Sequence, residues 1–110
     1  MRIIVDKIEQ EHMPLFRLHI FDAPHRRMHW RAIQNYRHAL NDAFKKIGVE
    51  IPIKTPIEVS ILFINPTSPD YDNLIAALWR ALDGNTLKKP AVLEDDGLIW
   101  GIQHVKKIYT

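Results

Sequence analysis

The stretch that decides the fold is IEVSILFI, residues 57–64. Apolar side chains alternate with Glu58 and Ser60 at first, and the end of the stretch is wholly apolar. A period of two predicts a strand, and an apolar run without alternation indicates that both faces of the strand are covered. We therefore expect this strand in a central position of a sheet. The next segment, Asn65-Pro66-Thr67-Ser68-Pro69, is typical of a loop.

A helix is expected directly after this loop, beginning between Asp70 and Asp72. Its apolar stripe recurs every three or four residues and comprises Leu74, Ala77, Leu78, Ala81 and Leu82. The residues Asp83-Gly84-Asn85 are typical of a helix end.

The other elements follow from the same periodicities. They are strands at 2–5, 15–21 and 99–109 and a helix at about 27–47 with Gly48 as its C-cap. The resulting order is β-β-α-β-α-β. It predicts an α+β fold: a small two-layer domain with a mixed sheet and two helices on one face. The chain has no internal repeat and no long linker, so we expect a single domain over residues 1–110.

The composition is that of an ordinary soluble protein. The chain has 110 residues, of which 46% are hydrophobic and 25% charged, and it contains no cysteine. Structural disulfides and cysteine-bound zinc are excluded, which fits a reducing compartment. No apolar run approaches the roughly 20 residues that span a bilayer, and charge interrupts the N-terminus too early for a signal peptide. We expect a cytoplasmic protein without a membrane segment, and the absence of phosphate-binding loop motifs argues against a nucleotide cofactor.

Basic residues form three groups although the net charge is only +2. The groups are Arg26, Arg27, Arg31, Arg37, Lys45 and Lys46 in and before the first helix, then Lys88 and Lys89, then Lys106 and Lys107. We place Arg31, Arg37, Lys45 and Lys46 on the polar face of that helix. Any one group could be an ordinary solvated surface. Three groups around an acidic region make a surface for nucleic acid more plausible.

Two pairs of acids suggest a metal site. Asp70 and Asp72 lie one residue apart, so an extended chain points both carboxylates to the same side. The alternative is that they only form a turn and cap the helix, a role that Asn73 could share.

The second acidic pair, Asp95 and Asp96, directly precedes the last strand. The alternative for this pair is a solvent-exposed turn that ends at Gly97. If the last strand lies beside the strand 57–64, its start can lie near the start of the second helix. The loops at 70 and 96 would then share one pocket. Converging carboxylates there would bind one or two Mg²⁺ ions, which activate water and polarise a phosphate.

Histidine and tryptophan give weaker signals. The six histidines show no zinc-binding pattern, and we expect His19 and His104 to be strand residues that face solvent or a partner. Helical spacing places Trp30 and Trp79 near the core, although tryptophan can also stack on nucleic-acid bases.

The two acidic motifs together resemble the RusA-type Holliday junction resolvases of bacteria and prophages. That family carries D-x-D-N-L at the start of a helix and paired aspartates before a strand, which here are Asp70 to Leu74 and Asp95-Asp96. The resemblance covers roughly residues 55–108. It implies a homodimeric, Mg²⁺-dependent endonuclease, with Mn²⁺ as a possible substitute, that nicks four-way DNA junctions symmetrically. It also implies that Asp70, Asp72 and Asp96 are catalytic metal ligands and that Asp95 shapes the site.

The chain departs from the family at two positions of the second helix. Ala76 stands where the family usually has a lysine, and Arg80 stands where it usually has an aspartate. Arg80 lies on the same helix face as Asp72 and Ala76. It could supply a cation in place of the lysine, from one helical turn beyond position 76. Junction DNA would be bound by Arg26, Arg27, Arg31, Lys88, Lys89, Lys106 and Lys107.

Two alternatives to the nuclease stay open. One is a branched-DNA-binding module of the same fold with weak or no cleavage, because the usual lysine is Ala76. The other is a structural protein whose acids are only caps and turns.

Overall fold

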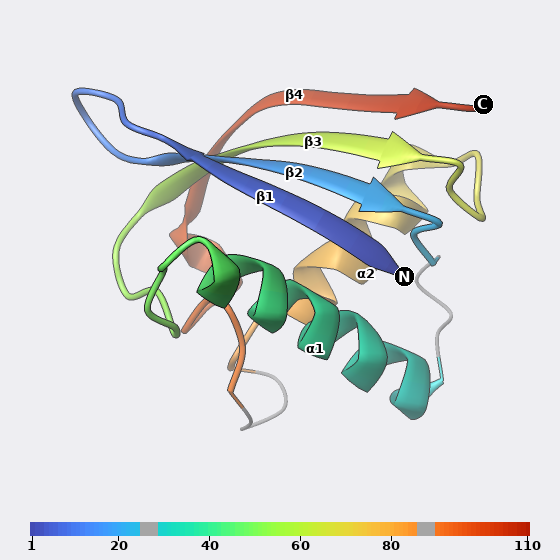
Figure 1. The fold of residues 1–110 in the computed structure, drawn as a ribbon, viewed down its shortest axis with the longest axis horizontal. Coiled ribbons are helices and arrows are strands. Elements are labelled where there is room, and N and C mark those ends of the chain that lie inside the picture. The colour runs from blue at the N-terminus through green and yellow to red at the C-terminus, as the bar shows by residue number, and fades with distance from the viewer. Residues whose placement is uncertain (25–28, 86–89) are drawn as a thin grey trace.

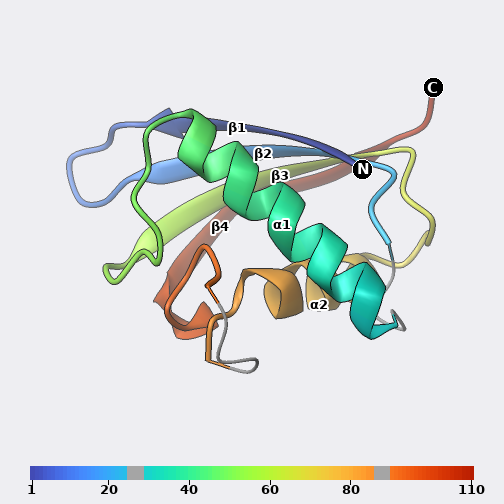
Figure 2. The ribbon, with the colours of Figure 1, turned by 60° about the horizontal axis from the view of Figure 1, so that its bottom comes forward.

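The computed structural model describes residues 1–24, 29–85 and 90–110. Its elements are β1 (Arg2–Ile8), β2 (Leu15–Phe21), α1 (Trp30–Lys46), β3 (Ile57–Ile64), α2 (Tyr71–Leu82), the short 3-10 helix η1 (Asp96–Leu98) and β4 (Ile99–Ile108). The strands form one sheet, and both helices lie against the same face of it (Figure 1, Figure 2). These observations confirm the α+β class, the element order and the two layers. The homodimer stays a prediction.

The element boundaries agree closely with the sequence patterns. The second and third strands begin and end at the predicted residues, whereas β1 continues to Ile8 instead of ending at residue 5. Ile47 is the C-cap of α1, and Gly48 follows it with a φ of 85°, a left-handed value that favours glycine. None of the described helices is long and apolar enough to cross a membrane.

The sheet topology decides where the acidic residues lie. The strand order is β1-β2-β3-β4, which confirms the predicted central position of β3 and places β4 beside it. β1 runs antiparallel to β2, whereas β2, β3 and β4 are parallel. Ile57 pairs with Ile99 and Ile64 with Ile108, so β3 and β4 start at the same end of the sheet. The helix α2 joins these parallel strands and therefore runs back along the sheet, from the end of β3 towards the start of β4 (Figure 1).

The core lies between the sheet and the helices. Its fully buried members include Phe16, Leu18 and Ile20 of β2, Val59, Ile61 and Phe63 of β3, Tyr36, Leu40 and Phe44 of α1, and Leu74, Ala77 and Leu78 of α2. Trp79 is partly buried and packs against this core, as predicted. Trp30 was expected near the core, but it is the first residue of α1 and is 52% exposed.

Arg37 departs from its predicted place on the polar face of α1. Its side chain is only 2% exposed. Nη2 donates hydrogen bonds to the carbonyl oxygens of Arg80, at 3.2 Å, and of Asp83, at 2.8 Å. These oxygens lie at the C-terminal end of α2, where the partial negative charge of a helix attracts a cation. Arg37 therefore fastens the end of α2 to α1.

Candidate metal centre

Three carboxylates meet at the C-terminal end of α2. Asp83, Asp95 and Asp96 each offer an oxygen, and these atoms all lie within 4.8 Å of one another. Asp83 is buried, Asp96 is half-buried and Asp95 is exposed. Carboxylate oxygens at this spacing are ligands of hard divalent cations. The cluster can hold a metal ion.

Asp83 is placed by a close approach of two backbone segments. It is the C-cap residue of α2, and it forms an isolated parallel bridge with Leu93. The Gly84 N–H donates to the Leu93 carbonyl at 2.8 Å, and the Leu93 N–H donates to the Leu82 carbonyl at 3.0 Å. A Cβ at residue 84 would lie 2.6 Å from the Leu93 carbonyl oxygen, so only glycine fits without a backbone shift. This contact brings the end of α2 next to the segment that leads into η1.

Asp95 and Asp96 are placed by the turn before β4. Asp95 is the N-cap residue of η1, and its Oδ1 accepts a hydrogen bond from the Gly97 N–H at 2.7 Å. Its carbonyl oxygen accepts from the Leu98 N–H at 3.1 Å. The turn that the sequence offered as an alternative is therefore present. The same turn also brings Asp95 and Asp96 to Asp83.

The charges of the cluster oppose one another. The pKa of the Asp96 carboxyl is raised above its ordinary value, first by burial and then by the negative charges of Asp83 and Asp95. Burial lowers the pKa of Arg37, and the charge of Asp83 partly opposes that shift. Arg37 therefore offsets some of the charge on Asp83 from the core side. A divalent cation would relieve the repulsion at Asp96.

Asp96→Asn is expected to raise the free energy of unfolding at pH 7 in metal-free buffer. A raised folded-state pKa means that the native protein holds the Asp96 proton more tightly than the unfolded chain does. Stability from this group is therefore fully present below the ordinary carboxyl pKa, about 4, and is lost as the pH rises through the raised value. Asn has no such loss. Urea titrations between about pH 3 and pH 7 would measure how the free energy of unfolding of each variant depends on pH, since this range contains the ordinary carboxyl pKa of about 4. Asp42→Asn, at an exposed acid of α1, is the control; equal pH profiles for wild type and Asp96→Asn would contradict the assignment.

Asp70 and Asp72 lie at the opposite end of α2. Asp70 is its N-cap residue, and Asp72 is exposed in its first turn. The Asn73 side chain donates to Asp70 Oδ2 at 3.2 Å. Because β3 and β4 are parallel, Asp96 lies at the start of the strands and Asp70 beyond the end of β3. Twelve helical residues separate the two ends by about 18 Å.

The prediction that the loops at 70 and 96 share one pocket is therefore wrong for loops of the same chain. The reason is topological, since the end of α2, and not its beginning, meets the start of β4. The structure brings Asp95 and Asp96 together with Asp83 and leaves Asp70 and Asp72 apart from them. The metal-binding role of Asp70 and Asp72 stays a prediction.

The basic residues predicted to bind DNA lie at different places in the fold. Lys107 lies at the start of α2, where its ammonium donates to the Pro69 carbonyl and lies 4.3 Å from the centre of the Tyr71 ring. Arg80 is exposed in the last turn of α2, two turns from Asp72, and Arg31 is exposed near the start of α1. Arg26, Arg27, Lys88 and Lys89 lie outside the described residues.

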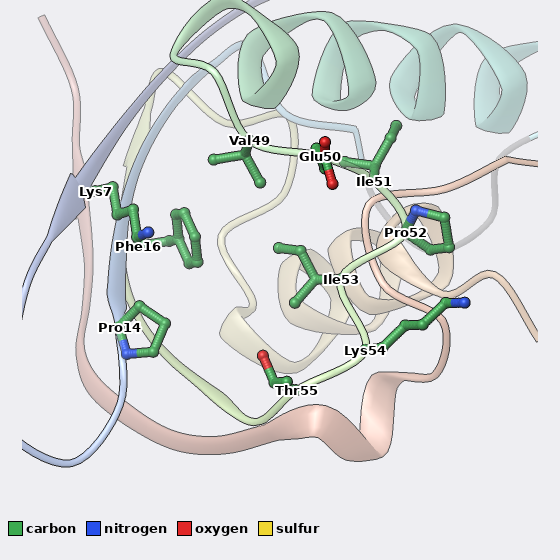
Figure 3. A pocket seen from close by; sticks show the side chains of 10 residues that line it. All are labelled: Lys7, Pro14, Phe16, Val49, Glu50, Ile51, Pro52, Ile53, Lys54 and Thr55. Carbon is green, nitrogen blue, oxygen red and sulfur yellow. The ribbon is translucent and has the colours of Figure 1, made fainter.

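A hollow beside the segment 49–55 does not contain the acidic cluster. It has a volume of about 530 Å³, and Phe16, Val49 and Ile53 gather around its middle (Figure 3). Lys7, Lys54 and the single acid Glu50 also line it. With one carboxylate among its lining residues, this hollow is not a metal site of the predicted kind. The backbone of Ile53, one of its lining residues, pairs with Leu93 next to the site.

The sequence patterns missed Asp83 as a site residue, because Asp83-Gly84-Asn85 is also a typical helix end. One signal was available. A carboxylate at the C-terminus of a helix meets the negative end of the helix dipole, so it is unfavourable there without a cation. In comparisons with known proteins, no protein-family model, no curated protein and no solved structure matched the chain.

Proposed function

We propose that the protein is a Mg²⁺-dependent, structure-selective endodeoxyribonuclease that resolves four-way DNA junctions by paired symmetric nicks. The observation that carries this proposal is the cluster of Asp83, Asp95 and Asp96 within 4.8 Å. Asp96 is the aspartate that both the cluster and the resemblance to the RusA-type resolvases assign to metal binding. Paired nicks require two sites, so the proposal includes a homodimer, and it places the enzyme in the cytoplasm.

The residues of the cluster fit a hard cation by their chemistry. All donors are carboxylate oxygens, and the pKa of Asp96 is raised first by burial and then by the negative charges of Asp83 and Asp95, which a cation would offset. Bound Mg²⁺, or Mn²⁺ in its place, would supply Lewis acidity and an activated water at the phosphodiester. The chain would contribute Asp83 as a ligand fixed by the backbone, Asp96 as a second ligand and Asp95 beside them.

The test is a nicking assay on a labelled synthetic four-way junction with Mg²⁺, Mn²⁺ and EDTA arms. We expect nicking with either metal, none in EDTA, and loss of nicking in Asp96→Asn. In the same buffers, saturating Mg²⁺ should raise the free energy of unfolding of the wild type by about 2.7 kcal/mol at 100 times its Kd, and Asp96→Asn should lose this gain. Absence of nicking and of any metal-dependent stabilisation would overturn the proposal.

A binding module without cleavage is the second candidate function. It is favoured by the separation of Asp70 and Asp72 from Asp96, and by Ala76, which is exposed on α2 where the resemblance leads us to expect a lysine. This candidate predicts tight junction binding without nicking in Mg²⁺ or Mn²⁺.

A further inference from the structure

The face of the sheet that is turned away from the helices carries two rows of side chains, which are basic or polar except for Leu62. The strand registers define the rows as Arg17–Ser60–His104 and His19–Leu62–Lys106, each running across β2, β3 and β4. The rows lie two residues apart along the strands, so their side chains point to the same side. All six residues line one shallow hollow of about 160 Å³. We call this surface the cationic sheet face.

The charge of the cationic sheet face is predominantly positive. Arg2 extends it at the next row of β1, where its guanidinium lies 3.9 Å from the centre of the Phe21 ring. The acid within this area is Asp6, which approaches Arg17 at 3.7 Å with both side chains about half exposed. Such exposed pairs contribute little, so Arg17 remains available to an anion.

Glu58 lies one row further along and is already engaged. Its Oε1 accepts hydrogen bonds from Gln10 at 2.8 Å and from Gln103 at 3.4 Å, and it lies 2.9 Å from His12 Nε2. These contacts hold the Glu58 carboxylate at the edge of the cationic sheet face. The middle of the face therefore presents Arg17, His19, His104 and Lys106 without a competing acid among the described residues that line the hollow.

The cationic sheet face is open to a large partner. Figure 1 shows both helices below the sheet, so no described helix covers this side. Arg17, His104 and Lys106 are exposed, and His19, Ser60 and Leu62 are half-buried. Neighbouring strands are about 4.8 Å apart. Arg17 of β2 and Lys106 of β4 are therefore separated by the width of β3, about 9.6 Å, where Ser60 and Leu62 lie.

We propose that the cationic sheet face binds the phosphodiester backbone of DNA. Arg17 and Lys106 can contact phosphate oxygens by charge, and His19 and His104 can donate hydrogen bonds to them; such contacts do not depend on base sequence. This side of the sheet presents no described helix to a major groove, so the contact positions the DNA without reading it. This goes beyond the proposed cleavage, because phosphate contacts on this face need no metal.

Fluorescence anisotropy with a labelled four-way junction and a labelled single strand, both in EDTA, tests the proposal. Arg17→Gln/Lys106→Gln is expected to weaken binding about tenfold and to reduce the slope of log K against log salt by about 2, over a range of about 50 to 200 mM salt. The matched control is Lys7→Gln/Lys54→Gln, which removes the same charge from the hollow beside the segment 49–55, away from the cationic sheet face. Its salt slope and affinity should stay close to those of the wild type.

Equal binding by the two double variants would overturn the inference. A changed sedimentation coefficient of Arg17→Gln/Lys106→Gln with unchanged DNA affinity would also overturn it, because the face would then join two copies of the chain. Thermal unfolding of both variants shows whether they are folded. The binding experiments contain no metal, so they are independent of cleavage. If the protein nicks junctions and Arg17→Gln/Lys106→Gln binds DNA like the wild type, only this inference is overturned. If binding is salt-sensitive and no nicking occurs, only the proposed cleavage is overturned.

Discussion

Asp83→Asn is expected to reduce Mg²⁺-dependent nicking of a four-way junction at least about 100-fold, which corresponds to about 2.7 kcal/mol of lost transition-state stabilisation. Asp83 is the buried member of the acidic cluster. Its backbone is fixed by the bridge to Leu93 and by the close contact between Gly84 and the Leu93 carbonyl. Asparagine keeps the shape of the side chain but removes the charge that would hold the metal. The measurement is the single-turnover nicking rate at saturating Mg²⁺.

The matched variants are Asp42→Asn and Asp70→Asn. Asp42 is exposed on α1, so its change should leave the nicking rate within twofold of the wild type, a difference of about 0.4 kcal/mol. Asp70→Asn tests the site that the resemblance implies at the other end of α2. Full activity of Asp83→Asn together with loss of activity in Asp70→Asn would contradict a metal centre at Asp83 and assign the chemistry to the start of α2.

The strands and helices could be predicted from the sequence because their signals are local. The alternation from Leu15 to Phe21 and the apolar run that ends at Ile64 depend only on which faces of a strand are buried. The same holds for the stripe of α2, which contains Leu74, Leu78 and Leu82.

The site could be predicted only in part because it depends on the direction of the chain. The sequence indicated the acidic pair Asp95-Asp96 before the last strand and a central strand at 57–64, and both are present. It did not indicate that α2 places Asp83, thirteen residues after Asp70, beside Asp96. The bridge at Leu93 that makes this contact has no periodic signal, since it joins single residues from two loops.

Arg37→Met is expected to lower the free energy of unfolding by about 3–5 kcal/mol, because it removes the buried guanidinium whose charge offsets that of Asp83. Arg37 is 2% exposed, caps the last carbonyls of α2 and interacts with the charge of Asp83. Methionine keeps much of the apolar volume but cannot donate to the Arg80 and Asp83 carbonyls. Urea unfolding at pH 7 measures the loss.

Arg31→Met on the exposed surface of the same helix is the matched control, and it should change stability by less than about 0.5 kcal/mol. Combining Arg37→Met with Asp83→Asn tests the cause of the loss. If the loss comes mainly from the charge of Asp83 that Arg37 no longer offsets, the double variant will be less destabilised than the sum of the single variants by about 0.5–3 kcal/mol. Strict additivity would mean that Arg37 acts only through the helix carbonyls. The acidic cluster would then depend on Arg37 for the position of Asp83 and not for its charge.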